Sequence, residues 1–237
     1  MLDLACGPGG WACDVARLYP QMDVIGVDIS EKMMHYAQAH AQAQRLDNAS
    51  FQVIDIINPL AFPDAAFDFI SARLLSSFMP TDAWPSFVQE CVRITRPGGI
   101  IQLTEGEWEF TNSAACERIA DMLTRAMWKD GKSFSPDGKR FGATLMITQF
   151  LKESGLINIQ RRAYALDYSF GTEAYETSYQ NLMMTYSLLS PFLVKMGVTT
   201  KEEYDQLCDQ ASVEMQKSTF RGLWFLLSIC GTKPDPA

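Results

Sequence analysis

The chain opens with Met1-Leu-Asp-Leu-Ala-Cys-Gly-Pro-Gly-Gly10 and continues directly into Trp11-Ala-Cys-Asp-Val-Ala-Arg-Leu-Tyr19. A short apolar run breaks into glycines, and apolar residues at helical spacing follow at once. This order predicts a strand, a tight turn and a helix whose first N–H groups face a ligand. A second apolar run, Val24-Ile-Gly-Val-Asp28, ends in an acid about 20 residues further on. In a doubly wound sheet, an acid at this place accepts hydrogen bonds from ribose hydroxyls.

Two nucleoside cofactors agree with this opening. Gly7-Pro-Gly-Gly-Trp-Ala12 fits the loose G-x-G-x-x-G/A pattern of dinucleotide-binding proteins, so NAD is one alternative. Asp3, inside the first strand, would repel a pyrophosphate and attract a cationic ligand. A third predicted strand, Phe51–Ile56, carries Asp55, which suits an adenine amino group. S-adenosylmethionine combines an ammonium, a sulfonium, a ribose and an adenine, so the three acids favour it over NAD.

Five segments carry a family resemblance: Leu2–Gly9, Val27–Ser30 with Met33, Val53–Ile56, Phe67–Ile70 and Arg96–Gly99. In order and spacing they resemble the successive motifs of class I S-adenosylmethionine-dependent methyltransferases, in the small-molecule branch that includes the ubiquinone and menaquinone methyltransferases. The resemblance covers roughly residues 1–105 well and the remainder in outline. Ala5 stands where the family usually has glycine. The resemblance implies an enzyme that moves a methyl group from S-adenosyl-L-methionine to a small, largely apolar metabolite by in-line displacement.

The resemblance also implies the fold, an α/β doubly wound, Rossmann-like sheet of seven strands whose last strand is antiparallel, in a single domain over residues 1–237. Later strands are predicted at 67–72, 100–104, 156–168 and 223–229, and helices at 31–46, about 112–130 and about 143–154. Residues 172–218, rich in Tyr, Met and Leu, predict two or three helices interrupted by Pro191 and Gly197. Inserted between strands six and seven, they would form a lid subdomain over the substrate.

For the cofactor, the resemblance gives each acid a role. Asp3 would order the glycine loop near the methionine ammonium, Asp28 would hold the ribose, and Asp55 would accept from the adenine amino group. Arg73 follows strand four, where the family offers a backbone carbonyl to the methionine amine; its side chain is alternatively a partner for an acidic substrate. The remaining cofactor-binding candidates supply backbone contacts, apolar packing or small volume: Ala5, Cys6, Gly7, Gly9, Ile29, Met33 and Ile56.

The catalytic group stays open at this point. Methyl transfer from a sulfonium needs positioning and dryness more than a strong base. If the acceptor is a hydroxyl, Glu105 and Glu107 are candidate bases, with a solvated or capping carboxylate as the alternative. The substrate-pocket candidates follow strand four or lie in the insertion: Leu74, Ser77, Phe78, Tyr175, Tyr179 and Met183. At helical spacing, the aromatic and methionine residues among them are alternatively plain core.

Composition narrows the class of protein. A net charge of −8 disfavours a nucleic-acid partner, because phosphate binding needs a basic face. No apolar run suggests a membrane span, and no signal peptide is recognised. The six scattered cysteines are typical of free thiols in a reducing cytosol, and neither they nor the two histidines form a metal motif. We therefore expect a cytoplasmic enzyme for a small molecule, without metal; a homodimer is left open.

Two other functions remain as alternatives. The first is a protein that binds S-adenosylmethionine without transferring its methyl group, as a scaffold or a non-methylating catalyst. The second is an NAD-dependent oxidoreductase. Family members usually carry one or two helices before the first strand that close over the ligand, whereas this sequence begins at the strand. The site would then be covered by another element, or the sequence is a piece of a longer chain.

Overall fold

Parallel β–α repeats build the first half of the molecule. In the computed structural model, which describes residues 1–108 and 110–236, β1 lies at the centre and pairs in parallel with β2 on one side and β4 on the other. β3 extends the sheet beyond β2, and β5 extends it beyond β4, again in parallel. The elements are β1 (Leu2–Leu4), α1 (Gly10–Leu18), β2 (Val24–Asp28), α2 (Glu31–Ala43), β3 (Ala49–Val53), β4 (Phe67–Arg73), the 3-10 turn η1 (Leu75–Ser77), α3 (Trp84–Ile94) and β5 (Thr95–Gly106).

The second half closes the sheet with antiparallel strands. β8 lies between β5 and β7 and runs antiparallel to both, with Thr104 opposite Ser228 and Ala163 opposite Leu227. The remaining elements are β6 (Phe110–Thr111), α4 (Ala114–Lys129), α5 (Ala143–Glu153), β7 (Ile157–Asp167), α6 (Tyr175–Lys195), α7 (Lys201–Met215) and β8 (Gly222–Thr232). The doubly wound sheet with an antiparallel last strand is confirmed. The two-residue β6, which also pairs with β8, adds an eighth strand that the sequence did not predict.

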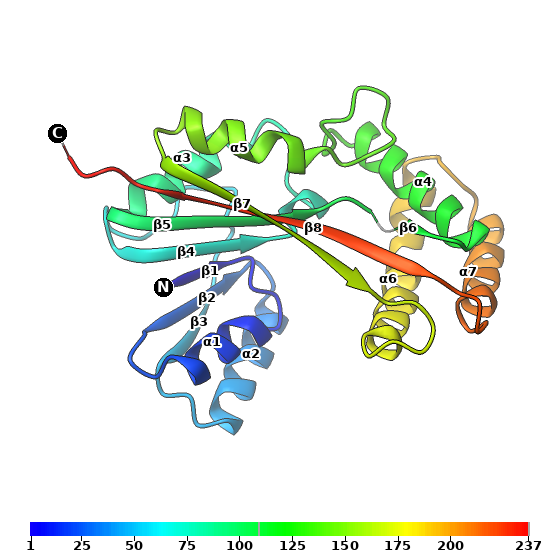
Figure 1. Cartoon of the computed structure of the whole chain (residues 1–237), viewed down its shortest axis with the longest axis horizontal. Coiled ribbons are helices and arrows are strands. Elements are labelled where there is room, and N and C mark those ends of the chain that lie inside the picture. Colours follow the sequence, from blue (N-terminus) through cyan, green and yellow to red (C-terminus); the bar gives the residue numbers. More distant parts are fainter. Residues whose placement is uncertain (109, 237) are drawn as a thin grey trace.

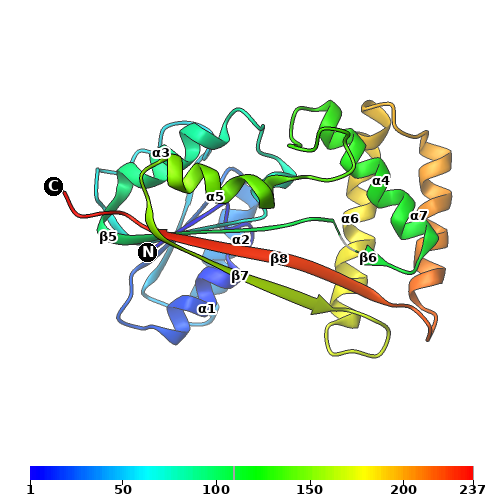
Figure 2. The ribbon, with the colours of Figure 1, turned by 45° about the horizontal axis from the view of Figure 1, so that its top comes forward.

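The helices form three groups around this sheet. α1 and α2 cover one face of the parallel half, and α3 and α5 cover the other (Figure 1). The antiparallel strands β7 and β8 extend beyond both groups as far as α4, α6 and α7. These three helices lie together at the far end of the sheet (Figure 2). The molecule therefore has a parallel β–α half and a helical end, joined by the long strands.

Each part has its own core. Under α3 and α5, the ring of Trp84 stacks on Phe150 with 6.1 Å between centroids. A separate cluster fills the space between α4, α6 and α7, where the buried Tyr204 hydroxyl donates to the Tyr186 carbonyl at 2.9 Å. The insertion between β7 and β8 forms two helices. The predicted break at Pro191 is wrong, because α6 continues through it to Lys195, at the cost of one helical hydrogen bond.

Glycine is required at two places beside the first turn because an aromatic ring fills the space. A Cβ on Gly9, which has a φ of 74° and precedes α1, would lie 2.7 Å from both Ala37 and Phe51. A Cβ on Gly26 in β2 would also meet the Phe51 ring at 2.7 Å. The ring thus holds the turn against α2 and β3, and the first N–H groups of α1 stay at the carboxyl edge of the sheet.

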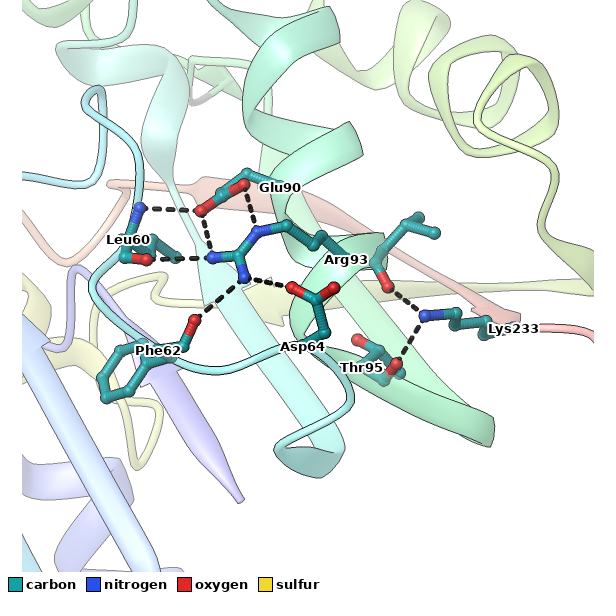
Figure 3. A network of polar contacts seen from close by, with 8 residues as sticks. Leu60, Phe62, Asp64, Glu90, Arg93, Thr95 and Lys233 are labelled. Atoms are coloured by element: carbon teal, nitrogen blue, oxygen red, sulfur yellow. Dashed lines mark hydrogen bonds and ion pairs between the residues drawn. The ribbon is translucent and has the colours of Figure 1, made fainter.

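A polar network fastens the opposite edge of the sheet (Figure 3). The Arg93 guanidinium donates to the carboxylates of Glu90 and Asp64 and to the carbonyls of Leu60 and Phe62. Lys233, just after β8, donates to two carbonyls at the end of α3, both at 2.8 Å. These bonds tie α3 to the segment that precedes β4 and to the end of β8. Among the described residues, no helix combines the length and hydrophobicity needed to cross a bilayer.

Candidate cofactor and substrate site

Asp28 holds the glycine turn in place. One oxygen of its carboxylate, Oδ2, accepts from the Gly7 N–H at 3.0 Å, and Oδ1 accepts from the Ser30 N–H at 2.9 Å. Each oxygen keeps a lone pair for another donor. The half-buried carboxylate therefore stands at the carboxyl end of β2, against the turn, with acceptor capacity to spare.

Asp3 and Arg73 form a charged pair on the neighbouring strands. Asp3 is 1% exposed, and its Oδ2 has no hydrogen-bond partner. The nearest cation is Arg73, whose Nη2 lies 3.8 Å away and whose guanidinium lies 4.7 Å from the centre of the Trp11 ring. Burial raises the pKa of Asp3 to about 7, while Arg73 and the neighbouring Ser71 hydroxyl act in the opposite direction. A buried carboxylate oxygen without a hydrogen bond, beside the glycine turn, is suited to a second cationic group.

Two residues without glycine's freedom adopt left-handed backbone at this edge. Ala5 has a φ of 55°, and Leu74, just after β4, has a φ of 58°. Such conformations cost free energy for residues with a Cβ and gather at functional sites. Both residues directly follow central parallel strands, so the strained backbone lies at the carboxyl edge of the sheet, where ligands of such sheets bind.

Cys6, the thiol of the glycine turn, is buried between α2 and β3. Its side chain packs with Met34, Ala37 and Phe51, and its N–H donates to the Val27 carbonyl at 2.9 Å. Burial, assisted by Asp3, raises the pKa of this thiol to about 12. The arrangement matches a space-filling residue and does not produce a reactive thiolate.

The residues assigned to the adenine lie on the segments after β2 and β3. Asp55 accepts from the Ile57 N–H at 3.0 Å and from the Asn58 amide at 2.8 Å, which forms a turn after β3. Ile56 is buried, whereas Ile29 is 67% and Met33 40% exposed. The two exposed apolar side chains are available to pack against a flat ring.

Both candidate bases hold backbone in place. The buried Glu105 accepts from the N–H groups of Leu75 and Ser76, at 2.6 and 3.2 Å, and from the Ser76 hydroxyl at 2.6 Å. Burial raises its pKa to about 7, and these hydrogen bonds act in the opposite direction. Glu107 accepts from the N–H groups of Phe141 and Gly142 at the start of α5. The geometry thus matches the capping alternative for both carboxylates.

A cavity of about 810 Å³ lies between η1, the ends of β5, β7 and β8, and the helices α4 and α6. Leu74 and Ser77, both predicted pocket residues, line it. Most of the remaining wall is apolar or aromatic. It includes Trp108, Leu123, Met127, Phe141, Leu166, Tyr168, Leu182, Leu189, Phe192 and Trp224.

Four predicted pocket residues lie outside this lining: Phe78, Tyr175, Tyr179 and Met183. The two tyrosines face α7 instead, because the Tyr175 hydroxyl donates to the Met215 carbonyl at 3.1 Å and the Tyr179 hydroxyl pairs with Ser212 at 2.9 Å. Met183 packs in the same helical core. The contacts of these three match the alternative of plain core, and Phe78, 38% exposed, is not among the cavity's lining residues.

The sequence reasoning missed the wall supplied by β7 and β8. Leu166 pairs with Trp224 across these strands, and the Trp224 indole donates to the Glu107 carbonyl at 2.8 Å. The alternation of residues along the two predicted strands is the signal that could have found them. Within the described part of the chain, no three His, Cys, Asp or Glu side chains gather as a metal site would need.

Comparison with known proteins agrees with this geometry. Residues 1–99 match the family model of a methyltransferase domain. The ubiquinone biosynthesis O-methyltransferase of Albidiferax ferrireducens is 32% identical over 140 residues, which are 57% of this chain and 54% of that protein. The chain spans between about a third and about half of the length of the first curated relatives that it matches.

Solved structures share the fold of the whole chain. The YcgJ protein of Bacillus subtilis superposes with a TM-score of 0.58 at 17% identity, covering 99% of this chain and 92% of that one. A phosphoethanolamine N-methyltransferase of Haemonchus contortus, solved with S-adenosyl-L-methionine, has a TM-score of 0.57 at 19% identity, covering 99% of this chain and 48% of that one. Residues 1–99 therefore resemble a methyltransferase domain, and the chain as a whole shares the fold of these solved structures.

Proposed function

We propose that this chain transfers a methyl group from S-adenosyl-L-methionine to a small, largely apolar molecule. The observation that carries the proposal is the buried carboxylate of Asp3 beside the glycine turn, whose Oδ2 has no hydrogen-bond partner and meets Arg73 only at 3.8 Å. This oxygen suits a cationic amino acid, and Leu74, next in the chain to Asp3's partner Arg73, lines an apolar cavity. The relative named as a ubiquinone biosynthesis O-methyltransferase supports an apolar acceptor.

The residues present fit the cofactor in chemical type. Asp28 would accept hydrogen bonds from the ribose hydroxyls, since each of its oxygens has a lone pair left. Asp55 would accept from the adenine amino group and the Ile56 N–H would donate to a ring nitrogen, while Ile29 and Met33 cover the ring. Asp3 would hold the methionine ammonium. When bound, the cofactor supplies an electrophilic methyl group on a sulfonium.

The chain's own part in the reaction is positioning. In-line displacement gains most from holding the acceptor close and aligned in a dry site. The apolar wall beyond Leu74 excludes water from the acceptor's side. Glu105 acts as a positioning residue, because its three hydrogen bonds fix the segment that carries Leu74 and Ser77. No general base is then required for an acceptor that is already nucleophilic.

The same proposal extends to the helical insertion and the compartment. Residues 172–218, which include the cavity wall of α6, would form a lid over the substrate within a single methyltransferase domain. The six cysteines, four of them buried, form no disulfide among the described residues, which favours the reducing cytoplasm. The net charge of −8 keeps nucleic acid an unfavourable partner.

Two measurements test the proposal. Calorimetry should show binding of S-adenosylmethionine, and Asp28→Ala should weaken it by on the order of 2 kcal/mol, because charge-assisted bonds to two hydroxyls are lost. Incubation with S-adenosylmethionine and a panel of apolar metabolites should release S-adenosylhomocysteine, detected by mass spectrometry. Binding without release from any acceptor would favour the non-methylating alternative. Absence of binding would contradict both, and a thermal shift with NADH alone would revive the oxidoreductase.

A further inference from the structure

The cavity between η1 and α6 has two charged side chains among its described lining residues, Glu107 and Lys132. They are not equivalent. The Glu107 carboxylate accepts from the N–H groups of Phe141 and Gly142 and from the Thr144 hydroxyl, at 2.7 to 3.3 Å. Its charge is therefore compensated by the N-terminus of α5. The other charge on the described wall is the ammonium of Lys132, which has one carboxylate partner, Asp130.

Lys132 keeps donor capacity on the cavity side. Its ammonium lies 2.6 Å from Asp130, which is not part of the cavity wall, and 5.8 Å from the centre of the Phe192 ring. An ammonium has three N–H donors, so one carboxylate leaves others for a second anion. The side chain is 24% exposed, and apolar groups such as Met127 and Leu189 line the cavity with it. In such surroundings, attraction between opposite charges is stronger than in bulk water.

The shape and polarity of the wall restrict the rest of the ligand. Thr177, Asn181 and Thr185 line the cavity at a spacing of four residues, which puts them on one face of α6 over about 12 Å. The lining also includes five aromatic side chains: Trp108, Phe141, Tyr168, Phe192 and Trp224. The cavity therefore offers a long apolar surface, a seam of neutral polar groups and one cation.

We propose that this cavity takes an apolar organic acid, a molecule with a carboxylate or a similarly acidic group on a largely apolar frame, and that Lys132 selects for the charge. The inference deepens the proposed function by naming its substrate class, and it does not depend on which atom receives the methyl group. Arg73 is a poorer candidate for this role. Its guanidinium lies over the Trp11 ring, and it does not line the cavity.

A matched pair of fluorescent probes tests the proposal in the full chain. 8-Anilinonaphthalene-1-sulfonate is anionic, and N-phenyl-1-naphthylamine is a neutral probe built on nearly the same frame. The unmodified chain should prefer the anionic probe. Lys132→Met should lower the affinity for the anionic probe about tenfold, since it removes a charge-assisted contact. The affinity for the neutral probe should change by less than about twofold. Asp130→Asn, which releases Lys132 from its present partner, should strengthen the anionic probe.

Controls locate the effect. Lys195→Met removes an exposed lysine at the end of α6 that does not line the cavity, and both probes should bind as before. Asn181→Trp fills the cavity and should weaken both probes. If Lys132→Met and the unmodified chain bind the anionic probe equally, the proposal is overturned, while intact binding of S-adenosylhomocysteine would leave the proposed function standing. If Lys132 selects the anionic probe but S-adenosylhomocysteine does not bind, the proposed function fails and the charge selection by this cavity stands.

Discussion

Ala5 is strained where most class I methyltransferases have glycine. Its φ of 55° lies in the left-handed region, where a Cβ costs about 1 kcal/mol. Ala5→Gly should therefore raise the free energy of unfolding by about 0.5–1 kcal/mol, because relief of strain exceeds the added freedom of the unfolded glycine. Urea unfolding measures the difference. Ala39→Gly, in the middle of α2 and exposed, is the matched control and should lower stability by about 1 kcal/mol; a similar loss at Ala5 would contradict the strain.

Asp3 links the ligand site to pH. Its pKa is raised from 3.8 to about 7, so between these values the folded chain keeps a proton that the unfolded chain has lost. The free energy of unfolding then falls as the pH rises through this window. Asp3→Asn has no group at this position that titrates in this window, so it does not lose this stability. The difference in free energy of unfolding, variant minus unmodified chain, should grow by on the order of 2 kcal/mol between about pH 5 and pH 8.

Asp3→Asn should also weaken the binding of S-adenosylmethionine, because it removes the negative charge that we assign to the methionine ammonium. Chemical unfolding at several pH values and calorimetry with the cofactor measure the two effects together. Asp47→Asn, at an exposed turn, is the control and should leave both unchanged. A difference between Asp3→Asn and the unmodified chain that stays constant with pH would contradict the raised pKa.

Glu107 acts on a whole element, the helix α5. Gly142 precedes α5 with a φ of 74° and offers no side chain for a cap, so the Glu107 carboxylate takes that role from the end of β5. Glu107→Ala should lower the free energy of unfolding by about 1–2 kcal/mol, the usual cost of losing an N-terminal cap. Thermal or urea unfolding measures it. Glu153→Ala, which removes an exposed contact to Gln149 at the other end of the helix, should cost less than about 0.5 kcal/mol. Equal losses would mean that Glu107 is not the cap.

Elements whose chemistry is local could be predicted from the sequence, and those made by tertiary contact could not. The glycine turn after β1 and the acids that end β2 and follow β3 are short local patterns that mark the ends of strands, so their strands and order are correct. The cavity is different, because its wall joins α6 to β7 and β8 across many residues. Periodicity identified α6 but not which of its faces meets the cavity. Tyr175 and Tyr179 were therefore predicted in the pocket, whereas their hydroxyls contact α7.

The molecule as a whole divides its tasks between two cores. The sheet core under α3 and α5 fixes the carboxyl edge of the parallel strands, where the glycine turn and the acids lie. The helical core of α4, α6 and α7 fixes the outer wall of the cavity. η1 belongs to the boundary, since Leu75 is part of the sheet core while Ser76 and Ser77 line the cavity. A nucleoside and an apolar acceptor would meet at this boundary.

This division predicts which amides a nucleoside ligand protects. S-adenosylhomocysteine should slow hydrogen exchange over Gly7–Trp11 and Asp28–Met33, which form the turns after β1 and β2, because binding stabilises the folded segments that it contacts. α7 packs mainly against α4 and α6, so its exchange should change little. Hydrogen exchange followed by mass spectrometry resolves these segments, and in Asp28→Ala at the same ligand concentration the protection should shrink. Protection centred on α4 and α6 would place the nucleoside in the cavity instead, and the assignment of the acids to the cofactor would then be wrong.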